Sequence, residues 1–286
     1  MIDTFTVEDT SIRLAAFLGV LLVMLAWERA APRRPVLPGQ ARRRLHNLVL
    51  IAFGTLLLRL LPSLSSLAAA AVAGAHGFGL LWQLPLPLPV WAELAVAIVL
   101  LDLAVYLQHL VFHRVPLLWR LHRVHHSDRE VDTTTGIRFH PLELLISMLY
   151  KAGIVLLTGA PLLAVMIFEI LLNTSSLFNH GNVFIPSRVD DALRRLLVTP
   201  DMHRVHHSVL REETDSNYGF NLSVWDRLFG TYRAQPRGGH DAMRIGLDEF
   251  RDQDVVNVGR LLRQPLINVA RTHASPTDLH QQGNQP

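Results

Sequence analysis

Long apolar stretches separated by short polar segments dominate the first two thirds of the chain. Leu14–Trp27 contains no charged residue, and Arg13 and Glu28 flank it. This stretch predicts a membrane helix of about 18 residues whose flanking charges reach the interface. A cleaved signal peptide fits less well, because the residues before the apolar stretch are acidic rather than basic. We therefore expect a membrane anchor.

Two further crossings are predicted before the middle of the chain. Leu48–Ala75 is apolar except for Arg59, so it is long enough to cross the membrane. The LPLPLP run at residues 84–89 predicts a stiff connector on the far side. Val90–Leu101 then begins a third crossing that returns the chain to the first side.

The segment between the first two apolar stretches, ERAAPRRPVLPGQARRR, predicts a Pro-broken loop rich in Arg. Short loops with many basic residues stay in the cytoplasm. We therefore expect this loop, and the chain after the third crossing, to be cytoplasmic. Its basic residues are Arg29, Arg33, Arg34, Arg42, Arg43 and Arg44.

Two shorter apolar stretches, Leu144–Leu157 and Leu162–Leu172, are separated by the turn sequence TGAP. Each is short for a full crossing. A helical hairpin over residues 142–178 that enters the membrane and returns fits both lengths. It places His140 and His180 on the cytoplasmic side, and it leaves Glu169 inside the membrane in need of a partner.

The remaining sequence predicts a helical cytoplasmic lobe. From residue 182 onward no apolar run is long enough for the membrane. The fold class is therefore an all-α membrane protein with about three transmembrane helices and a membrane hairpin. We divide it into N-terminal helices and the Arg-rich loop (1–93), a catalytic unit (94–235) and a C-terminal tail (236–286). The last twelve residues, SPTDLHQQGNQP, are predicted to be disordered.

Composition limits the chemistry and the partners. Half of the residues (50%) are hydrophobic and 18% are charged, as expected for a membrane protein. The absence of Cys excludes disulfides, thiolate metal ligands and iron–sulfur clusters, so any metal must be held by nitrogen and oxygen. The net charge of +3 is small, and no nucleic-acid-binding module is present, so nucleic acid is not an expected partner.

Histidine carries the strongest pattern in the sequence. The motif HRVHHS occurs twice, although a His-x-x-His-His pattern is expected by chance only about 0.04 times in a chain of this composition. Histidines at i, i+3 and i+4 share one helix face, where they either titrate together or bind a metal. With HLVFH and NHGN the candidates number nine, which is too many for one ion and predicts two metal ions. They are His109, His113, His122, His125, His126, His180, His203, His206 and His207.

Several polar residues near these motifs are predicted to orient the metal ligands. Asp102 lies on the same helix stripe as His109 and His113, and a polar contact between helices is the alternative. His140 either supports a ligand or makes a structural hydrogen bond at the start of the hairpin. The full set of such candidates is Asp102, His140, Asn179, Asn182 and Asp201.

The motifs HLVFH, HRVHH and HRVHH resemble the three histidine boxes of the integral-membrane fatty acid hydroxylase and sterol desaturase superfamily. The resemblance also includes RFHPLE (138–143) and NYGFNLSVWDRLFGTY (217–232), and it covers roughly residues 94–232. It implies that the nine histidines bind two non-haem iron ions. Some members of the family have a further His four residues before His180, where this chain has Ser176.

The resemblance implies an O2-dependent oxidoreductase that hydroxylates or desaturates a lipid such as a fatty acyl chain or sterol. Unactivated C–H bonds require a redox metal, and a lipid enters from the bilayer. The chain has no GxGxxG, no Cys and no haem-binding HPGG. Electrons from NAD(P)H are therefore expected to arrive through a separate reductase, ferredoxin or cytochrome b5-type partner.

A membrane zinc protein, either a hydrolase or a structural or metal-carrying protein, is the alternative, because imidazole also binds zinc. A hydrolase needs a general base, for which Glu143, Asp201 and Glu212 are candidates. None of them lies in an HExxH-like arrangement, and nine histidines exceed what a hydrolase needs.

Overall fold

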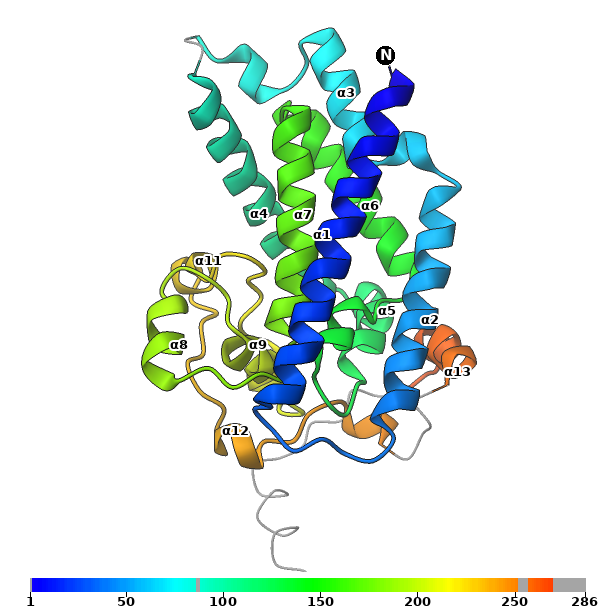
Figure 1. The fold of residues 1–286 in the computed structure, drawn as a ribbon, viewed down its shortest axis with the longest axis vertical. Coiled ribbons are helices and arrows are strands. Elements are labelled where there is room, and N and C mark those ends of the chain that lie inside the picture. The colour runs from blue at the N-terminus through cyan, green and yellow to red at the C-terminus, as the bar shows by residue number, and fades with distance from the viewer. Residues whose placement is uncertain (1, 86–87, 252–256, 270–286) are drawn as a thin grey trace, which may run out of the picture.

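The structure, a computed structural model, describes residues 2–85, 88–251 and 257–269 as helices joined by turns (Figure 1). No β-strand occurs in these ranges, where the only pairings of this kind are isolated bridges. The α-helices are α1 (Ile2–Ala30), α2 (Gln40–Arg59), α3 (Ser66–His76), α4 (Val90–Arg114), α5 (Pro116–His126), α6 (Pro141–Thr158), α7 (Leu162–Asn179), α8 (Ser187–Leu193), α9 (Pro200–His206), α10 (Arg211–Thr214), α11 (Val224–Leu228), α12 (Gly239–Ala242) and α13 (Val258–Arg263). The 3₁₀ helices are η1 (Pro62–Leu64), η2 (Leu80–Gln83), η3 (Thr133–Ile137), η4 (Asp248–Phe250) and η5 (Gln264–Leu266).

Four of these helices are long and apolar enough to cross a membrane: α1 from Ser11, α4, α6 and α7. They run along the long axis of the molecule (Figure 1). The core between α3, α4, α6 and α7 contains small residues such as Ala69, Ala97 and Ala164 beside Phe168. Small side chains let membrane helices approach closely. The predicted all-α membrane fold is therefore confirmed.

The second predicted crossing is not one helix. Within 48–75, α2 ends at Arg59 and α3 begins at Ser66, so the chain breaks at residues 60–65. Pro62 lacks a backbone N–H, and the Ser65 side chain accepts a hydrogen bond from the N–H of Ala68 (3.2 Å) to start a new helix. Both α2 and α3 pack against α6, so the two together line the bundle in place of one continuous helix.

The predicted hairpin is present as α6 and α7, joined by a tight turn at residues 159–161. Each helix has 18 residues, about 27 Å, and is longer than its apolar stretch because the polar ends continue the helix. At the tip, Gly159 has φ +70°, and a Cβ on Gly79 would lie 2.3 Å from the Gly159 nitrogen. Only glycine fits this approach, which fixes the hairpin tip against the segment after α3.

Charged residues of the membrane region and of the Arg-rich segment are paired inside the protein. Glu169 in α7 forms ion pairs with Arg13 in α1 and with Lys151 in α6 (3.9 Å), so its expected partner exists. The Arg-rich segment is not a loop throughout, because α2 begins at Gln40 and includes Arg42–Arg44. Arg43 is buried and faces the protein interior.

The C-terminal part packs against the histidine-bearing unit over its described residues, and so it is not a free tail there. Phe250 is buried in a cluster with Trp119 of α5. Leu261 in α13 is buried with Leu50 of α2 and Val124 of α5. The predicted disorder of residues 275–286 lies outside the described ranges.

Candidate metal centre

Four helix ends bring the nine candidate histidines together. The C-terminal end of α4, the helix α5, the end of α7 and the helix α9 converge at the end of the bundle opposite α3 (Figure 1). All nine side chains are buried, with His109 the most accessible at 6%. Histidine is seldom buried in such numbers without a partner that satisfies the ring nitrogens.

The rings form two adjacent groups. One contains five histidines and the other four, and within each group one nitrogen of every ring lies within 4.8 Å of the others. The five-histidine group is His109, His113, His122, His126 and His206. The four-histidine group is His125, His180, His203 and His207. Every histidine predicted from the sequence falls into one of these two groups.

Each HRVHHS motif contributes to both groups, in opposite ways. The first and third histidines of the first motif, His122 and His126, join the five-histidine group, and the middle one, His125, joins the other. In the second motif the first and third join the four-histidine group, and the middle one, His206, joins the five. Residues at i and i+4 stack along one line of a helix, and residue i+3 points about 60° away from that line. The spacing HxxHH therefore serves two neighbouring sites from one helix turn.

Hydrogen bonds to backbone carbonyls fix the tautomer of three rings. The Nδ1 atoms of His109, His180 and His206 lie 2.8, 2.7 and 2.7 Å from backbone carbonyl oxygens. These acceptors are the carbonyls of Tyr218, Ser176 and Ser216. His122 Nδ1 lies 2.6 Å from Glu143 Oε1. Because a carbonyl oxygen only accepts, the Nδ1 atoms of His109, His180 and His206 carry the proton and their Nε2 atoms present lone pairs.

Nε2 atoms meet at the centre of both groups. The lone pair of His109 Nε2 lies 3.2 Å from His122 Nε2. His180 Nε2 lies 3.1 Å from His125 Nε2 and 3.0 Å from His203 Nε2, but its single lone pair cannot accept from both rings. Two nitrogens that bind one metal ion at about 2.1 Å and a right angle are about 3.0 Å apart. The donor set and its spacing therefore fit a cation in each group.

Further ring nitrogens support this conclusion. Both nitrogens of His126 and of His207 are buried without a hydrogen-bond partner among the described residues, as is His206 Nε2. A buried polar atom left unpaired costs about 1–3 kcal/mol. Several such atoms facing one another are explained if each binds a metal ion.

The electrostatic environment keeps these rings neutral. Burial lowers the pKa of His122 to about 3 and that of His180 to about 4. Burial, followed by the neighbouring histidines, lowers the pKa of His126, His203 and His207 well below the ordinary 6.5. A metal ligand must be the neutral imidazole, so the rings are in the binding form at neutral pH without a proton having to leave.

Glu143 supports the site, and we did not predict this role. It lies in the first turn of α6, is buried, and holds the His122 ring. A carboxylate behind a ligand ring fixes its orientation and raises its basicity. The only signal in the sequence was its place in RFHPLE, where it was considered as a hydrolytic base. The three carbonyl acceptors have no sequence signal, because every residue has a carbonyl.

The five predicted supporting residues are placed elsewhere. Asp102 accepts hydrogen bonds from the Trp225 indole (2.8 Å) and the Asn221 side chain (2.7 Å), and so ties α4 to the loop before α11. His140 caps α6 by accepting from the N–H of Leu142, which is the structural alternative named above. The others bind as follows: Asn179 donates to the Phe220 carbonyl, Asn182 exchanges hydrogen bonds with the backbone of Arg34, and Asp201 pairs with Arg33 and Arg204.

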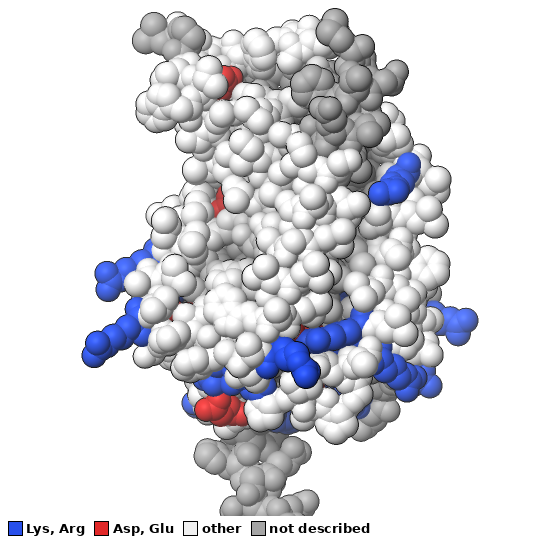
Figure 2. Space-filling model, viewed as in Figure 1, with Lys and Arg blue, Asp and Glu red and all other residues white. Residues whose placement is uncertain are grey.

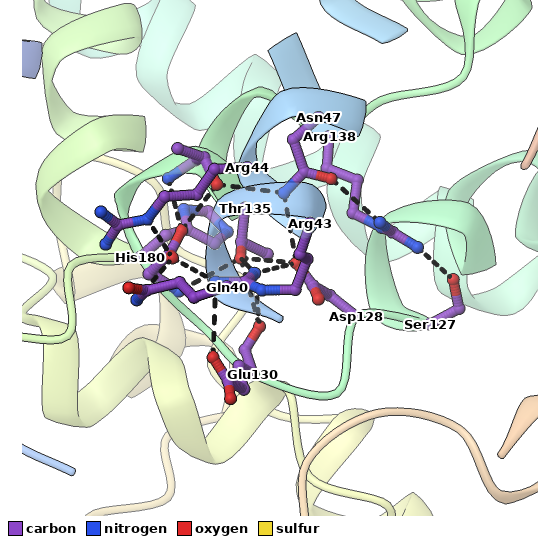
Figure 3. Close-up of polar contacts among 12 residues, drawn as sticks. Gln40, Arg43, Arg44, Asn47, Ser127, Asp128, Glu130, Thr135, Arg138 and His180 are labelled. Carbon is purple, nitrogen blue, oxygen red and sulfur yellow. Dashed lines mark hydrogen bonds and ion pairs between the residues drawn. The ribbon is translucent and has the colours of Figure 1, made fainter. Parts of the chain in front are cut away.

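A buried ionic network supports the first HRVHHS motif from α2. Arg43 reaches Asp128 (2.7 Å) and Asp132, just beyond the motif (Figure 3). Arg138 donates to the side chain of Asn47 (2.9 Å) and to Ser127 Oγ (3.1 Å), the last residue of the motif. Breaking a buried pair of this kind typically costs about 3–5 kcal/mol. The N-terminal helices are thus part of the support of the histidine groups.

A cavity of about 620 Å³ lies against the five-histidine group. His113 lines it together with Trp119 and Tyr218, and the His113 and Tyr218 rings are 5.1 Å apart. Its remaining lining includes charged residues from the end of α4, from α5, from α10 and just after it, and from η4. It is therefore a route by which a molecule reaches one face of the histidine cluster.

Comparison with known proteins agrees with this site. A family model described as fatty acid hydroxylase matches residues 94–231, which contain all nine histidines. This part of the chain is therefore similar to the fatty acid hydroxylase family, within the superfamily that the histidine boxes resemble.

Named relatives are lipid oxygenases. The chain is 31% identical to an ornithine lipid hydroxylase of Rhizobium tropici, over 52% of this chain and 44% of that protein. It is 29% identical to the alkylglycerol monooxygenase of Homo sapiens, over 47% of this chain and 29% of that protein. A cholesterol 25-hydroxylase-like protein of Danio rerio is 30% identical over 50% of this chain and 55% of its own length. The matches thus span about half or less of these relatives, and no solved structure matches.

Proposed function

We propose that this protein is a membrane oxidoreductase that uses two iron ions and O2 to hydroxylate a lipid. The observation that carries the proposal is the pair of adjacent buried histidine groups whose Nε2 atoms face one another. The names of the relatives, which are hydroxylases and monooxygenases, favour hydroxylation over desaturation. The five-histidine group holds one ion and the four-histidine group the other.

Iron, when bound, supplies the redox chemistry by which one C–H bond and O2, with two electrons and two protons, become C–OH and water. The chain's own residues prepare the site. The carbonyls of Tyr218, Ser176 and Ser216 keep the proton on Nδ1 of three rings and so aim each Nε2 inward, and Glu143 holds the His122 ring. Burial of the rings limits the access of bulk water to the ligands.

Electrons come from a separate protein that draws on NAD(P)H. The sequence has no dinucleotide-binding glycine motif, haem-binding motif or cysteine. A reductase, ferredoxin or cytochrome b5-type donor supplies the two electrons.

The histidine groups face the cytoplasm. On the face shown in Figure 2, Lys and Arg gather at the end that carries α5 and α9, and the bundle above it is nearly free of charge. An excess of basic residues marks the cytoplasmic side. Arg43 and Arg44 form ion pairs inside the protein, so only the exposed basic residues bear on the orientation in the membrane. A tag beside His122 that labels only from outside the cell would contradict this orientation.

Zinc hydrolysis is not favoured by the contacts of the candidate bases. Glu143 is bound to His122, Asp201 to Arg204 and Arg33, and Glu212 is an exposed residue beside Arg237. None of these carboxylates is free to activate a water molecule between the two histidine groups.

Metal content is the direct test. Protein purified aerobically in detergent, without added metal, should contain about two iron ions per chain. The variant His203→Ala, His206→Ala, His207→Ala should lose them, and His76→Ala, an exposed histidine in α3, should keep them. The loaded protein with a reductase system should add one oxygen atom to a lipid, measured by mass spectrometry. Two zinc ions that iron cannot replace with activity would refute the proposal.

A further inference from the structure

Cationic residues surround the cavity beside His113. Arg114, Arg120, Arg123 and Arg211 line it, against the two carboxylates Asp215 and Glu249. Arg211 is bound to Asp215 (3.0 Å). The other three guanidinium groups form no ion pair with a described residue. The cavity therefore has an excess of positive charge.

Arg123 carries one of these charges and is held in a fixed position by neighbouring residues. It is only 4% exposed. Its guanidinium donates to the carbonyls of Gln264 (2.5 Å) and Ile267 (2.7 Å) and lies over the Phe250 ring at 5.1 Å. Its Nε is buried without a hydrogen-bond partner. A buried guanidinium held by carbonyls and a ring keeps its full charge, which an anion in the cavity would neutralise.

The position of the cavity selects an amphipathic ligand. Arg114 is the last residue of α4, and Pro116 is the first of α5, so the cavity lies where a membrane-spanning helix ends. The N-terminus of α5 adds the positive end of its helix dipole. Val115 and Leu117, the chain neighbours of the lining residue Pro116, are exposed apolar side chains, at 40% and 70%. Apolar residues beside a basic cavity at the interface suit a lipid headgroup better than a soluble anion.

We propose that this cavity binds the anionic phosphate or carboxylate head of the lipid substrate and so presents the carbons next to the head to the five-histidine group. His113 lines the cavity and belongs to that group, and Arg114 follows it in sequence. Arg120 and Arg123 flank His122 on α5 in the same way. The naming of this lipid as the substrate rests on the proposed function, whereas its binding does not.

Binding is measured by calorimetry on the detergent-purified protein with two short-chain lipids that differ in head charge. Dihexanoyl phosphatidic acid should bind at least about tenfold more tightly than dihexanoyl phosphatidylcholine. The variant Arg114→Gln, Arg120→Gln should weaken the first by about tenfold and leave the second unchanged. Arg188→Gln, Arg195→Gln removes the same charge from exposed residues at α8 and should change neither. Inorganic phosphate alone should compete only weakly, because it lacks the chain.

Several outcomes would overturn the inference. Equal affinity for the two lipids would show that the cavity does not distinguish the charge of the lipid head. Displacement of the lipid by inorganic phosphate with equal affinity would mean a free-anion site. Unchanged lipid binding in the Arg114, Arg120 variant, with slower reduction by an acidic ferredoxin, would make the cavity a docking site for the donor instead. The iron content is measured on the same samples, so the loss of iron with retained lipid binding would refute only the proposed function.

Discussion

The two HRVHHS segments share six residues and differ in almost every contact outside the histidines. The first lies in and just after α5, a helix of 11 residues, and the second in and just after α9, a helix of seven. Both Val residues, Val124 and Val205, are completely buried. Each segment gives two histidines to one group and one to the other, with the groups exchanged. Helix spacing thus fixes which histidines go together, and the placement of the helix decides which group they join.

Arginine shows the difference most clearly. Arg204 in the second segment pairs with Asp201 and donates to the Gly181 carbonyl (3.3 Å). Arg123 in the first donates to two carbonyls and lines the cavity. Arg204 thus makes its contacts inside the protein, whereas Arg123 also lines a cavity. An identical local sequence therefore does not determine an identical role.

The largest expected effect comes from removing pairs of ligands. His113 and His206 belong to the same group but to different motifs, so His113→Ala, His206→Ala should retain about one metal ion per chain. His203 and His206 belong to the same motif but to different groups, so His203→Ala, His206→Ala should weaken metal binding in both groups and leave neither fully occupied. Iron is counted per chain by plasma mass spectrometry, with His76→Ala as the control. If the His113, His206 variant bound less iron than the His203, His206 variant, the assignment of the histidines to the two groups would be wrong.

A smaller effect is expected from the residue that contacts Nδ1 of the first histidine in the first motif. Glu143→Gln replaces the carboxyl group that is hydrogen-bonded to His122 Nδ1, and iron affinity should fall by about 10- to 100-fold. His203 Nδ1 has no hydrogen-bond partner among the described residues, so the second motif has no equivalent. Competition with a chelator measures the affinity. The matched control is Glu212→Gln at the surface; an equal loss in both variants would show that Glu143 acts only through net charge.

The two arginines should differ in their contribution to stability. Arg204→Met leaves Asp201 without its nearest partner and should lower the free energy of unfolding by about 2 kcal/mol, discounted because Asp201 is 19% exposed and keeps Arg33. Arg123→Met removes two hydrogen bonds to carbonyls and the contact with the Phe250 ring, but no ion pair, and should cost about 1 kcal/mol. Thermal unfolding in detergent gives both values, and Arg188→Met should have almost no effect. A larger loss for Arg123 would contradict the comparison.

The last prediction concerns pH. Burial lowers the pKa of the histidines in both motifs, so the folded protein keeps them neutral, and the unfolded chain takes up protons below about pH 6.5. The metal-free protein should therefore lose stability between pH 7.5 and 5.5, by up to about 1.4 kcal/mol per histidine for each pH unit below 6.5. Replacing the three histidines of either motif by Gln should reduce this loss equally. A pH dependence unchanged from that of the native protein would mean that these rings are protonated in the fold.

The sequence predicted the parts of the fold that follow from hydrophobic length. The first helix, the third crossing and the hairpin are where the apolar stretches placed them. The second crossing was interrupted because Pro62 and Ser65 end one helix and start another, although hydropathy there stays high. Arg43 counted toward a cytoplasmic loop but is a buried ion-pair partner, since charge alone does not tell a solvated Arg from a paired one.

For the site, the sequence identified the residues but not their supports. Nine histidines were recognisable because of repeated spacing, which is local. Their division between two groups depends on how α4, α5, α7 and α9 converge, which is not local. Asp102 was expected to orient a metal ligand because it shares a helix stripe with His109. In the structure, its carboxylate instead accepts hydrogen bonds from the side chains of Asn221 and Trp225. Glu143 was underestimated because a single carboxylate has no spacing pattern.

The ion pair between Arg13 and Glu169 has a consequence for biosynthesis. Arg13 is in α1, which precedes the other three membrane helices in the chain, and Glu169 is in α7, which follows them. Until α7 is made, Arg13 lacks this partner, and a charged side chain in an unassembled membrane helix stays near the lipid headgroups. Arrival of α7 draws α1 against the hairpin, so α1 takes its final place only after the other membrane helices are inserted. The order of translation and the order of assembly are therefore different in this protein.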